Sequence, residues 1–151
     1  MGKKVIAKNK KAYFDYEIIT KFEAGIVLKG SEIKSIRAGN VNLKGGFVRV
    51  FGEDAYLMDV HISPYKYSDA ETKKNYDEKR QRKLVLHKKE VATIANKLNN
   101  QGVGVVPLEI YLKGGLAKVL IGIGKGKKKY DKRETIKKRD LDREARGRLK
   151  R

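Results

Sequence analysis

The segment VVPLEIYLKGGLAKVLIGIG, residues 105–124, decides the fold class. Two apolar stretches flank Gly114-Gly115, and a glycine pair between such stretches is a strong signal for a two-residue β-hairpin turn. In the first stretch apolar and more polar residues alternate, so we expect each set to occupy one face of a strand. The apolar set is Leu108, Ile110 and Leu112, and the other set is Glu109, Tyr111 and Lys113. The domain is therefore expected to be built around an antiparallel sheet.

The sequence before this hairpin contains further short strand-like segments separated by turn signals. They are residues 16–28, residues 46–51 and 55–62 on either side of a Gly-Glu-Asp turn, and residues 82–87. Gly25 interrupts the first of them, and a glycine inside a strand pattern predicts a bulge at that position.

Two helices are expected between these strands. The first covers residues 30–39, with Ser31 as the N-cap and Gly39 as the C-terminal stop. The second covers residues 91–98, where apolar side chains recur at helical spacing. Gly102 follows and predicts the end of this helix.

About six strands and two peripheral helices in residues 1–124 predict a mainly β domain, an oligonucleotide-binding (OB)-like closed antiparallel barrel. A half-open α+β sheet is the alternative. Residues 63–81 are polar and rich in tyrosine, which predicts a long exposed loop. Gly122, Gly124 and Gly126 alternate after an apolar run, and we expect the last strand to become flexible there.

Residues 125–151 form a second part of the chain, a basic C-terminal tail. They hold 14 of the 37 Lys and Arg residues and 5 of the 18 Asp and Glu residues. Charge pairs at helical spacing are present, but the apolar stripe contains only Ile136, Leu141, Ala145 and Leu149. We expect the tail to be disordered when free and helical when bound.

The formal net charge of +19 predicts a polyanionic partner, because each neutralised phosphate releases counterions. A membrane surface is the rival, but the sequence contains no run of 18 apolar residues. The absence of cysteine agrees with a reducing compartment, and we expect a cytoplasmic protein. RNA is favoured because Tyr65, Tyr67 and Tyr130 lie in polar contexts suited to stacking on bases.

Three basic clusters are candidates for phosphate contacts, each weighed against an ordinary solvated surface. The first pairs Lys34 with Arg37 on the expected helix. The second lies in RQRK, residues 80–83, with Tyr76 nearby, and comprises Arg80, Arg82 and Lys83. The third comprises Lys125, Lys127, Lys128 and Lys129.

The residues give no support for catalysis. The glycines of residues 121–134 lack the spacing of a Walker loop or a dinucleotide fingerprint. His61 and His87 are isolated, and no serine-hydrolase arrangement is present. Glu32 is expected to serve the dipole of its helix. We expect no enzyme activity, no metal and no cofactor.

Several consecutive segments resemble the small protein B (SmpB) family of bacterial tmRNA-binding proteins. They are NKKAYFDYEI (9–18), FEAGIVLKGSEIKSIRAGNVNLK (22–44), HISPY (61–65), RKLVLH (82–87) and GKGKKKYDKRETIKKR (124–139). The similarity covers nearly the whole chain in the family's order. It implies a barrel that binds the tRNA-like domain of transfer-messenger RNA (tmRNA) and delivers it to stalled 70S ribosomes for trans-translation.

The resemblance also implies roles for individual residues. Glu23, Val85 and Lys118 match RNA-contacting positions of the family, and Asn42 in a matched segment joins this set. The tail is implied to act in the decoding centre and mRNA path, with Tyr130 as a candidate to stack on a ribosomal base. The tail set is Lys128, Lys129, Tyr130, Asp131, Lys132, Arg133 and Ile136.

The expected partners are therefore tmRNA and the decoding-centre rRNA of the 70S ribosome, with no membrane, and the free protein is expected to be a monomer. Two other classes remain open. A ribosome-associated structural protein would co-purify with normal ribosomes at constant stoichiometry. A small RNA-modifying enzyme would show turnover with a cofactor.

Overall fold

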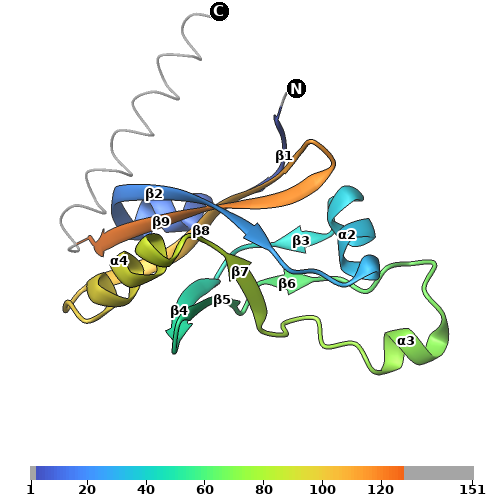
Figure 1. Cartoon of the computed structure of the whole chain (residues 1–151). Coiled ribbons are helices and arrows are strands. Elements are labelled where there is room, and N and C mark those ends of the chain that lie inside the picture. Colours follow the sequence, from blue (N-terminus) through green and yellow to red (C-terminus); the bar gives the residue numbers. More distant parts are fainter. Residues whose placement is uncertain (1–2, 128–151) are drawn as a thin grey trace, which may run out of the picture.

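The chain is described by a computed structural model covering residues 3–127. In this part of the chain seven strands form one antiparallel sheet in the order β1-β8-β9-β2-β7-β5-β4, and β3 pairs with β6 in a second sheet (Figure 1). The strands are β1 (Lys3–Lys8), β2 (Tyr16–Ile26), β3 (Val41–Asn42), β4 (Phe47–Phe51), β5 (Asp54–Met58), β6 (His61–Ile62), β7 (Arg82–Val85), β8 (Val103–Lys113) and β9 (Leu116–Gly126). The helices are α1 (Lys10–Asp15), α2 (Gly30–Arg37), α3 (Ala70–Lys74) and α4 (Lys88–Leu98).

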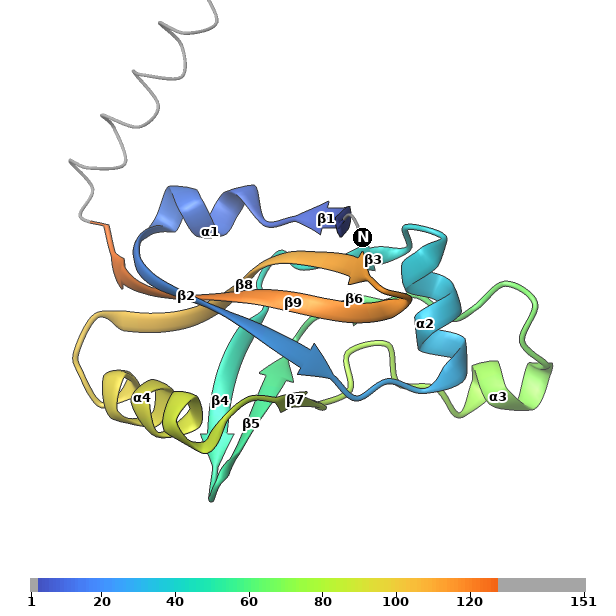
Figure 2. The ribbon, with the colours of Figure 1, turned by 45° about the horizontal axis from the view of Figure 1, so that its top comes forward.

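The main sheet is open, which corrects the predicted closed barrel. The long strands β2, β8 and β9 run together, and β4, β5 and β7 cross beneath them (Figure 2). To close the barrel, β4 would have to pair with the outer edge of β8. Within the described residues β1 covers only the Glu109–Lys113 part of that edge, and β4 is not hydrogen-bonded to the remaining part, so β1 and β4 stay as the two edges of the sheet. The mainly β, antiparallel class is confirmed, and the half-open alternative describes it better.

The predicted hairpin at the end of the domain is confirmed. Lys113 pairs with Leu116 across Gly114 and Gly115. Both glycines have left-handed backbone angles, with φ of 58° and 78°, as the tight turn requires. The hairpin provides two of the three 11-residue strands of the main sheet, and the third, β2, pairs with its second strand.

A bulge in β8 corrects the predicted pattern of faces. The pairing of β8 with β9 shifts between Pro107 and Glu109. Because one extra residue reverses the side-chain alternation, Leu108 packs with Ala12 beneath α1, while Ile110 belongs to the main core. The predicted common face therefore holds for Ile110 and Leu112 but not for Leu108.

The glycines of β9 are firmly placed, contrary to the predicted flexible end. Gly122 and Gly124 pair with β2 on one side and β8 on the other. A Cβ on Gly124 would lie 2.7 Å from the Cβ of Tyr16, and one on Gly122 would lie 2.7 Å from Leu108 Cδ1. Glycine is therefore needed here for close packing.

Gly25 is also not a bulge. It pairs regularly with Val85 of β7 and Lys118 of β9, while the irregularity in β2 lies between Ile18 and Thr20. This regular position between two strands matters for the site described below.

The helices follow the predictions with three differences. Helix α2 has Lys29 as its N-cap and not Ser31, and Gly39 follows its end with a φ of 84°. Helix α4 is confirmed and buries Val91 and Ile94 against the core. The predicted loop over residues 63–81 contains the short helix α3, and α1 was not predicted at all.

We predict that Gly124→Ala lowers the free energy of unfolding by about 1–3 kcal/mol, because its Cβ would be forced against Tyr16 Cβ. Gly30→Ala is the matched control, because a Cβ there meets nothing within 4 Å. Urea denaturation of both variants measures the difference. Equal stability of the two variants would contradict the close packing of this strand.

Candidate nucleic-acid interface

Three of the predicted RNA-contacting residues meet in one surface hollow of about 460 Å³. Glu23 comes from β2, Val85 from β7 and Lys118 from β9. The N-terminal end of α4 contributes His87 and Glu90 to the same hollow. Residues distant in the sequence are brought together because β2 lies between β7 and β9 in the sheet.

Gly25 lines the hollow between two of its functional residues. It faces Val85 on one side and Lys118 on the other in the strand register. A Cβ built at this position would lie 3.2 Å from Val85 Cβ and 3.9 Å from Lys118 Nζ. Because Gly25 has no side chain, a ligand can reach the surface between Val85, an exposed apolar contact, and the cation of Lys118. Val85 is 59% exposed, which is unusual for a valine in a sheet.

Glu23 is an ionised carboxylate held by neighbours on the sheet. The Tyr111 hydroxyl donates to Glu23 Oε2, and Lys113 Nζ lies 3.6 Å from the same atom. The hydrogen bond from Tyr111, followed by the charges of Lys113 and Lys118, lowers the pKa of Glu23 below its ordinary value. Burial and this hydrogen bond raise the pKa of Tyr111, which remains a donor. A fixed carboxylate of this kind accepts hydrogen bonds from base amino groups.

The predicted contact at Arg82 is corrected by the structure. Its side chain is completely buried and donates from Nε to Glu32 Oε2 at 2.6 Å. Nη1 donates to the carbonyls of Val60 and Arg80, and Nη2 donates to the Tyr76 hydroxyl and the carbonyl of Glu78. All donors of the guanidinium are thus used inside the domain, and none is left for phosphate.

Glu32 is the centre of this buried network, which is more than the predicted helix-dipole role. Its carboxylate accepts from Arg80 Nη2 at 2.5 Å and from the backbone N–H of Lys29 at 2.8 Å, in addition to Arg82. Burial raises the pKa of Glu32, but the hydrogen bonds from Arg80, Lys29 and Arg82 outweigh it, and the net pKa is lowered. Burial raises the pKa of Tyr76 to about 12, so its hydroxyl remains protonated within the network.

The other predicted residues are spread over the surface. Lys34 and Arg37 are exposed on α2, and Asn42 is exposed on β3, where its Oδ1 accepts from Lys44 N. Lys83 is exposed on β7 and lies 3.5 Å from Asp54.

At the far end of β9, Lys125 is exposed, seven residues beyond Lys118 and so about 23 Å away along the strand. Lys127 follows it and is half-buried. These cations therefore do not line the hollow. The predicted tail residues, from Lys128 to Ile136, lie outside the described residues.

The sequence reasoning missed Tyr111 and Lys113 as partners of Glu23. The sequence predicted correctly that Tyr111 and Lys113 share a face with Glu109. It did not show the strand register that places Glu23 of β2 near them, on the other side of β9. The available signal was a tyrosine and a lysine two residues apart on the more polar face of β8, where Tyr111 is buried and Lys113 is exposed.

Within residues 3–127 no cluster of three or more His, Asp or Glu side chains is arranged to hold a metal ion. None of the helices in this same part has the length and apolar character needed to cross a membrane.

The profile of the protein family described as "SmpB protein" matches residues 6–151 of this chain. The chain belongs to the SmpB family. The match includes all three residues of the hollow and continues through the basic tail.

Curated relatives agree with the SmpB assignment over nearly full length. The SsrA-binding protein of Latilactobacillus sakei is 54% identical over 140 residues, which cover 93% of this chain and 88% of the relative. The SsrA-binding protein of Geotalea uraniireducens is 51% identical over 150 residues, covering 99% and 97%. A solved structure described as "tmRNA-SmpB: a journey to the center of the bacterial ribosome" matches with a TM-score of 0.68 and 43% identity, over 86% of this chain and 93% of that one.

We predict that Glu32→Gln lowers the free energy of unfolding at pH 7 by about 3 kcal/mol, because the buried guanidinium of Arg82 and the partly buried one of Arg80 lose their counter-charge. The folded-state pKa of Glu32 lies below its ordinary value of 4.5. Its contribution is therefore fully present above that value and is lost as the pH falls through the lower folded-state pKa. The difference in the free energy of unfolding between the unmodified protein and Glu32→Gln should become smaller only in this acidic range.

Urea denaturation between pH 7 and pH 3 measures this gap. Glu53→Gln is the control, because Glu53 is exposed at the turn between β4 and β5. A gap that stays constant down to the lowest pH would show that the Glu32 charge does not stabilise the fold.

Proposed function

We propose that this chain binds tmRNA through the hollow at Glu23, Val85 and Lys118 and carries it to stalled ribosomes for trans-translation. The tRNA-like domain of tmRNA is the part assigned to the hollow. The proposal makes the chain a binding protein without catalytic activity of its own.

The observation that carries this proposal is the meeting of three chemically different contacts in one hollow. Lys118 supplies a cation for a phosphate, Val85 an exposed apolar contact for a sugar or base, and Glu23 an acceptor for base amino groups. Phosphate contacts position an RNA, while the other two contacts provide selectivity. Family membership and the SsrA-binding relatives support the choice of tmRNA over other RNAs.

The basic tail is assigned a separate role. The tail is proposed to act in the decoding centre of the ribosome and in the mRNA path. The segment assigned to the decoding centre is Lys128-Lys129-Tyr130-Asp131-Lys132-Arg133. Asp131 and Glu134 resemble a capping box, which supports helix formation once the ribosome provides a surface. Tyr130 is proposed to stack on a ribosomal base.

We predict that Lys118→Ala weakens binding to full-length tmRNA about tenfold and reduces the slope of log K against log salt by about one, as loss of one phosphate contact requires. Lys97→Ala is the matched control. It removes the same charge from the last turn of α4, about 15 Å along the helix from His87 at the rim of the hollow. Filter binding or calorimetry at several salt concentrations measures both.

If Lys97→Ala weakens tmRNA binding as much as Lys118→Ala does, the affinity follows net charge and the hollow is not the binding site. The RNA that co-purifies with the unmodified protein tests the function itself. A broad mixture of mRNA or rRNA, with no dominant structured RNA, would overturn the proposal.

Truncation after Lys129 tests the division between domain and tail. We expect the thermal midpoint of unfolding to change little, because the core described above lies within residues 3–127. Binding to isolated tmRNA should fall only modestly, whereas tagging of proteins on stalled ribosomes should be lost. A truncated protein that supports tagging at the full-length rate would refute the role of the tail.

A further inference from the structure

A pair of tyrosines on the loop before α3 has no role in the hollow or in the core. The rings of Tyr65 and Tyr67 lie 5.5 Å apart, centroid to centroid, at an interplanar angle of 69°. Tyr67 is 76% exposed, the largest exposure among the large hydrophobic side chains of the described chain. An exposed ring of this size adds little to folding, and here it is paired with a second ring and accompanied by cations.

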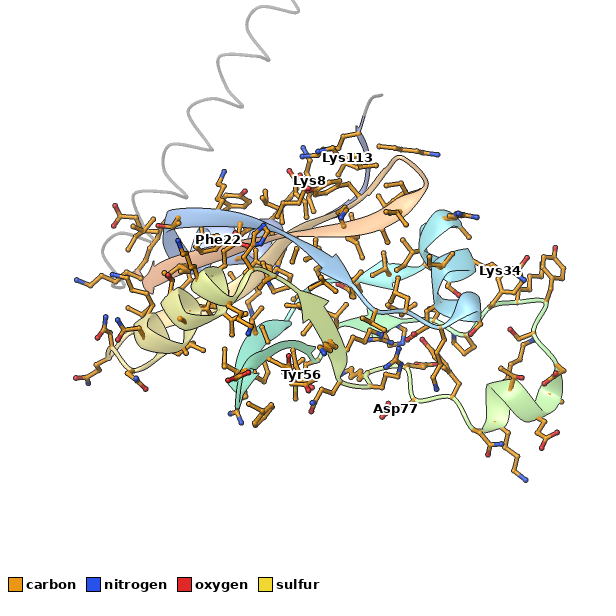
Figure 3. The ribbon with its side chains drawn as sticks, in the orientation of Figure 1. Lys8, Phe22, Lys34, Tyr56, Asp77 and Lys113 are labelled. Atoms are coloured by element: carbon orange, nitrogen blue, oxygen red, sulfur yellow. The ribbon has the colours of Figure 1, made fainter. Side chains whose placement is uncertain are left out.

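Two lysines accompany these rings. Lys34 Nζ of α2 lies 5.4 Å from the centroid of Tyr65, and Lys66 Nζ lies 5.6 Å from the centroid of Tyr67. Figure 3 shows Lys34 extending from α2 on the side of this loop. Each distance is within the range of a cation–π contact, so the cations and the rings form one surface. We call the set of Lys34, Tyr65, Lys66 and Tyr67 the tyrosine platform.

The loop that carries the platform is held by hydrogen bonds within itself and by one bond to the segment after α2. Ser68 N donates to the carbonyl of Tyr65 at 3.0 Å and closes a turn. Lys73 Nζ donates to the carbonyl of Lys66 at 2.7 Å, and Ser63 N donates to the carbonyl of Asn40 at 3.1 Å. The nearby carboxylate of Asp69 accepts from Thr72 N as the cap of α3. The two rings are therefore presented in a defined geometry.

The platform is continuous with the hollow along α2. Arg37 Nη2 donates to the carbonyl of Gly115 at 3.4 Å, which places Arg37 at the β8–β9 turn beside Leu116 of the hollow. Lys34 lies one helical turn before Arg37 and reaches Tyr65. A strip of cations thus leads from the hollow to the exposed rings.

We propose that the tyrosine platform binds unpaired bases of an RNA strand that leaves the hollow. Exposed aromatic rings flanked by cations suit single-stranded RNA, because bases stack on the rings while the lysines neutralise the backbone. The geometry favours one or two bases, since the rings are tilted to one another and only Tyr67 is widely exposed. This inference rests on the proposed function, because it assigns a second contact to the RNA held at the hollow.

A tryptophan placed at the platform tests the inference directly. Tyr67→Trp introduces an indole into a chain that contains no tryptophan, so its fluorescence reports on this position alone. We expect a short oligoadenylate and full-length tmRNA to quench it by base stacking. Phe51→Trp is the matched control, because Phe51 is 48% exposed at the tip of the β4–β5 hairpin and lies near no platform cation. Its fluorescence should not respond to oligoadenylate.

Binding measurements complete the test. Tyr67→Ala should lower the affinity for oligoadenylate about tenfold, whereas Tyr67→Phe should retain it, because the ring and not the hydroxyl stacks. Absence of quenching together with unchanged affinity of Tyr67→Ala would overturn the platform. A blue shift with anionic phospholipid vesicles, without quenching by RNA, would also overturn it and assign the surface to a membrane.

The failure of this inference is separable from failure of the proposed function. If tmRNA binding depends on Lys118 but neither RNA quenches the new indole, the platform is wrong and the hollow stands. If the unmodified protein does not bind tmRNA, the proposed function fails, whatever the response of Tyr67→Trp to oligoadenylate.

Discussion

The arrangement of this domain depends on one buried carboxylate, that of Glu32, and on the two arginines that neutralise it. Glu32 lies in the first turn of α2, while Arg80 lies at the end of the long loop and Arg82 begins β7. A buried charge without a partner costs several kcal/mol, so the three residues must come together when the domain folds. Their contact fixes α2 against β7, and the hydrogen bond from Arg82 Nη1 to the carbonyl of Val60 ties the end of the long loop to the segment before it.

This constraint also prepares the RNA site. With Arg82 locked in place, β7 lies beside β2, and Val85 comes opposite Gly25. The glycine leaves the space that a side chain would fill, and Lys118 borders it from β9. The basic cluster of residues 80–83, predicted from the sequence to bind RNA, is thus divided by burial. Arg82 is buried and organises the sheet, whereas Lys83 and Val85 on the same strand are exposed.

Charge is distributed over the chain according to three separate tasks. Lys118 lines the hollow and the cations on α2 face outward, Arg82 at the start of β7 faces inward, and the tail adds a further positive segment. The chain can therefore carry a net charge of +19 and still bury a charged network, because the buried arginines are paired with Glu32 and with backbone carbonyls.

The sequence by itself was sufficient for features with a local cause. The glycine pair of the last hairpin, the apolar spacing of α4 and the family motifs each predicted what was found, because turn geometry, helical periodicity and motif order are encoded within short segments. The tertiary structure alone decided the burial of Arg82, the reversal of Leu108 by a bulge, and the open sheet. Each of these depends on which distant strand occupies an edge or supplies a counter-charge, and the local pattern of residues does not contain that pairing.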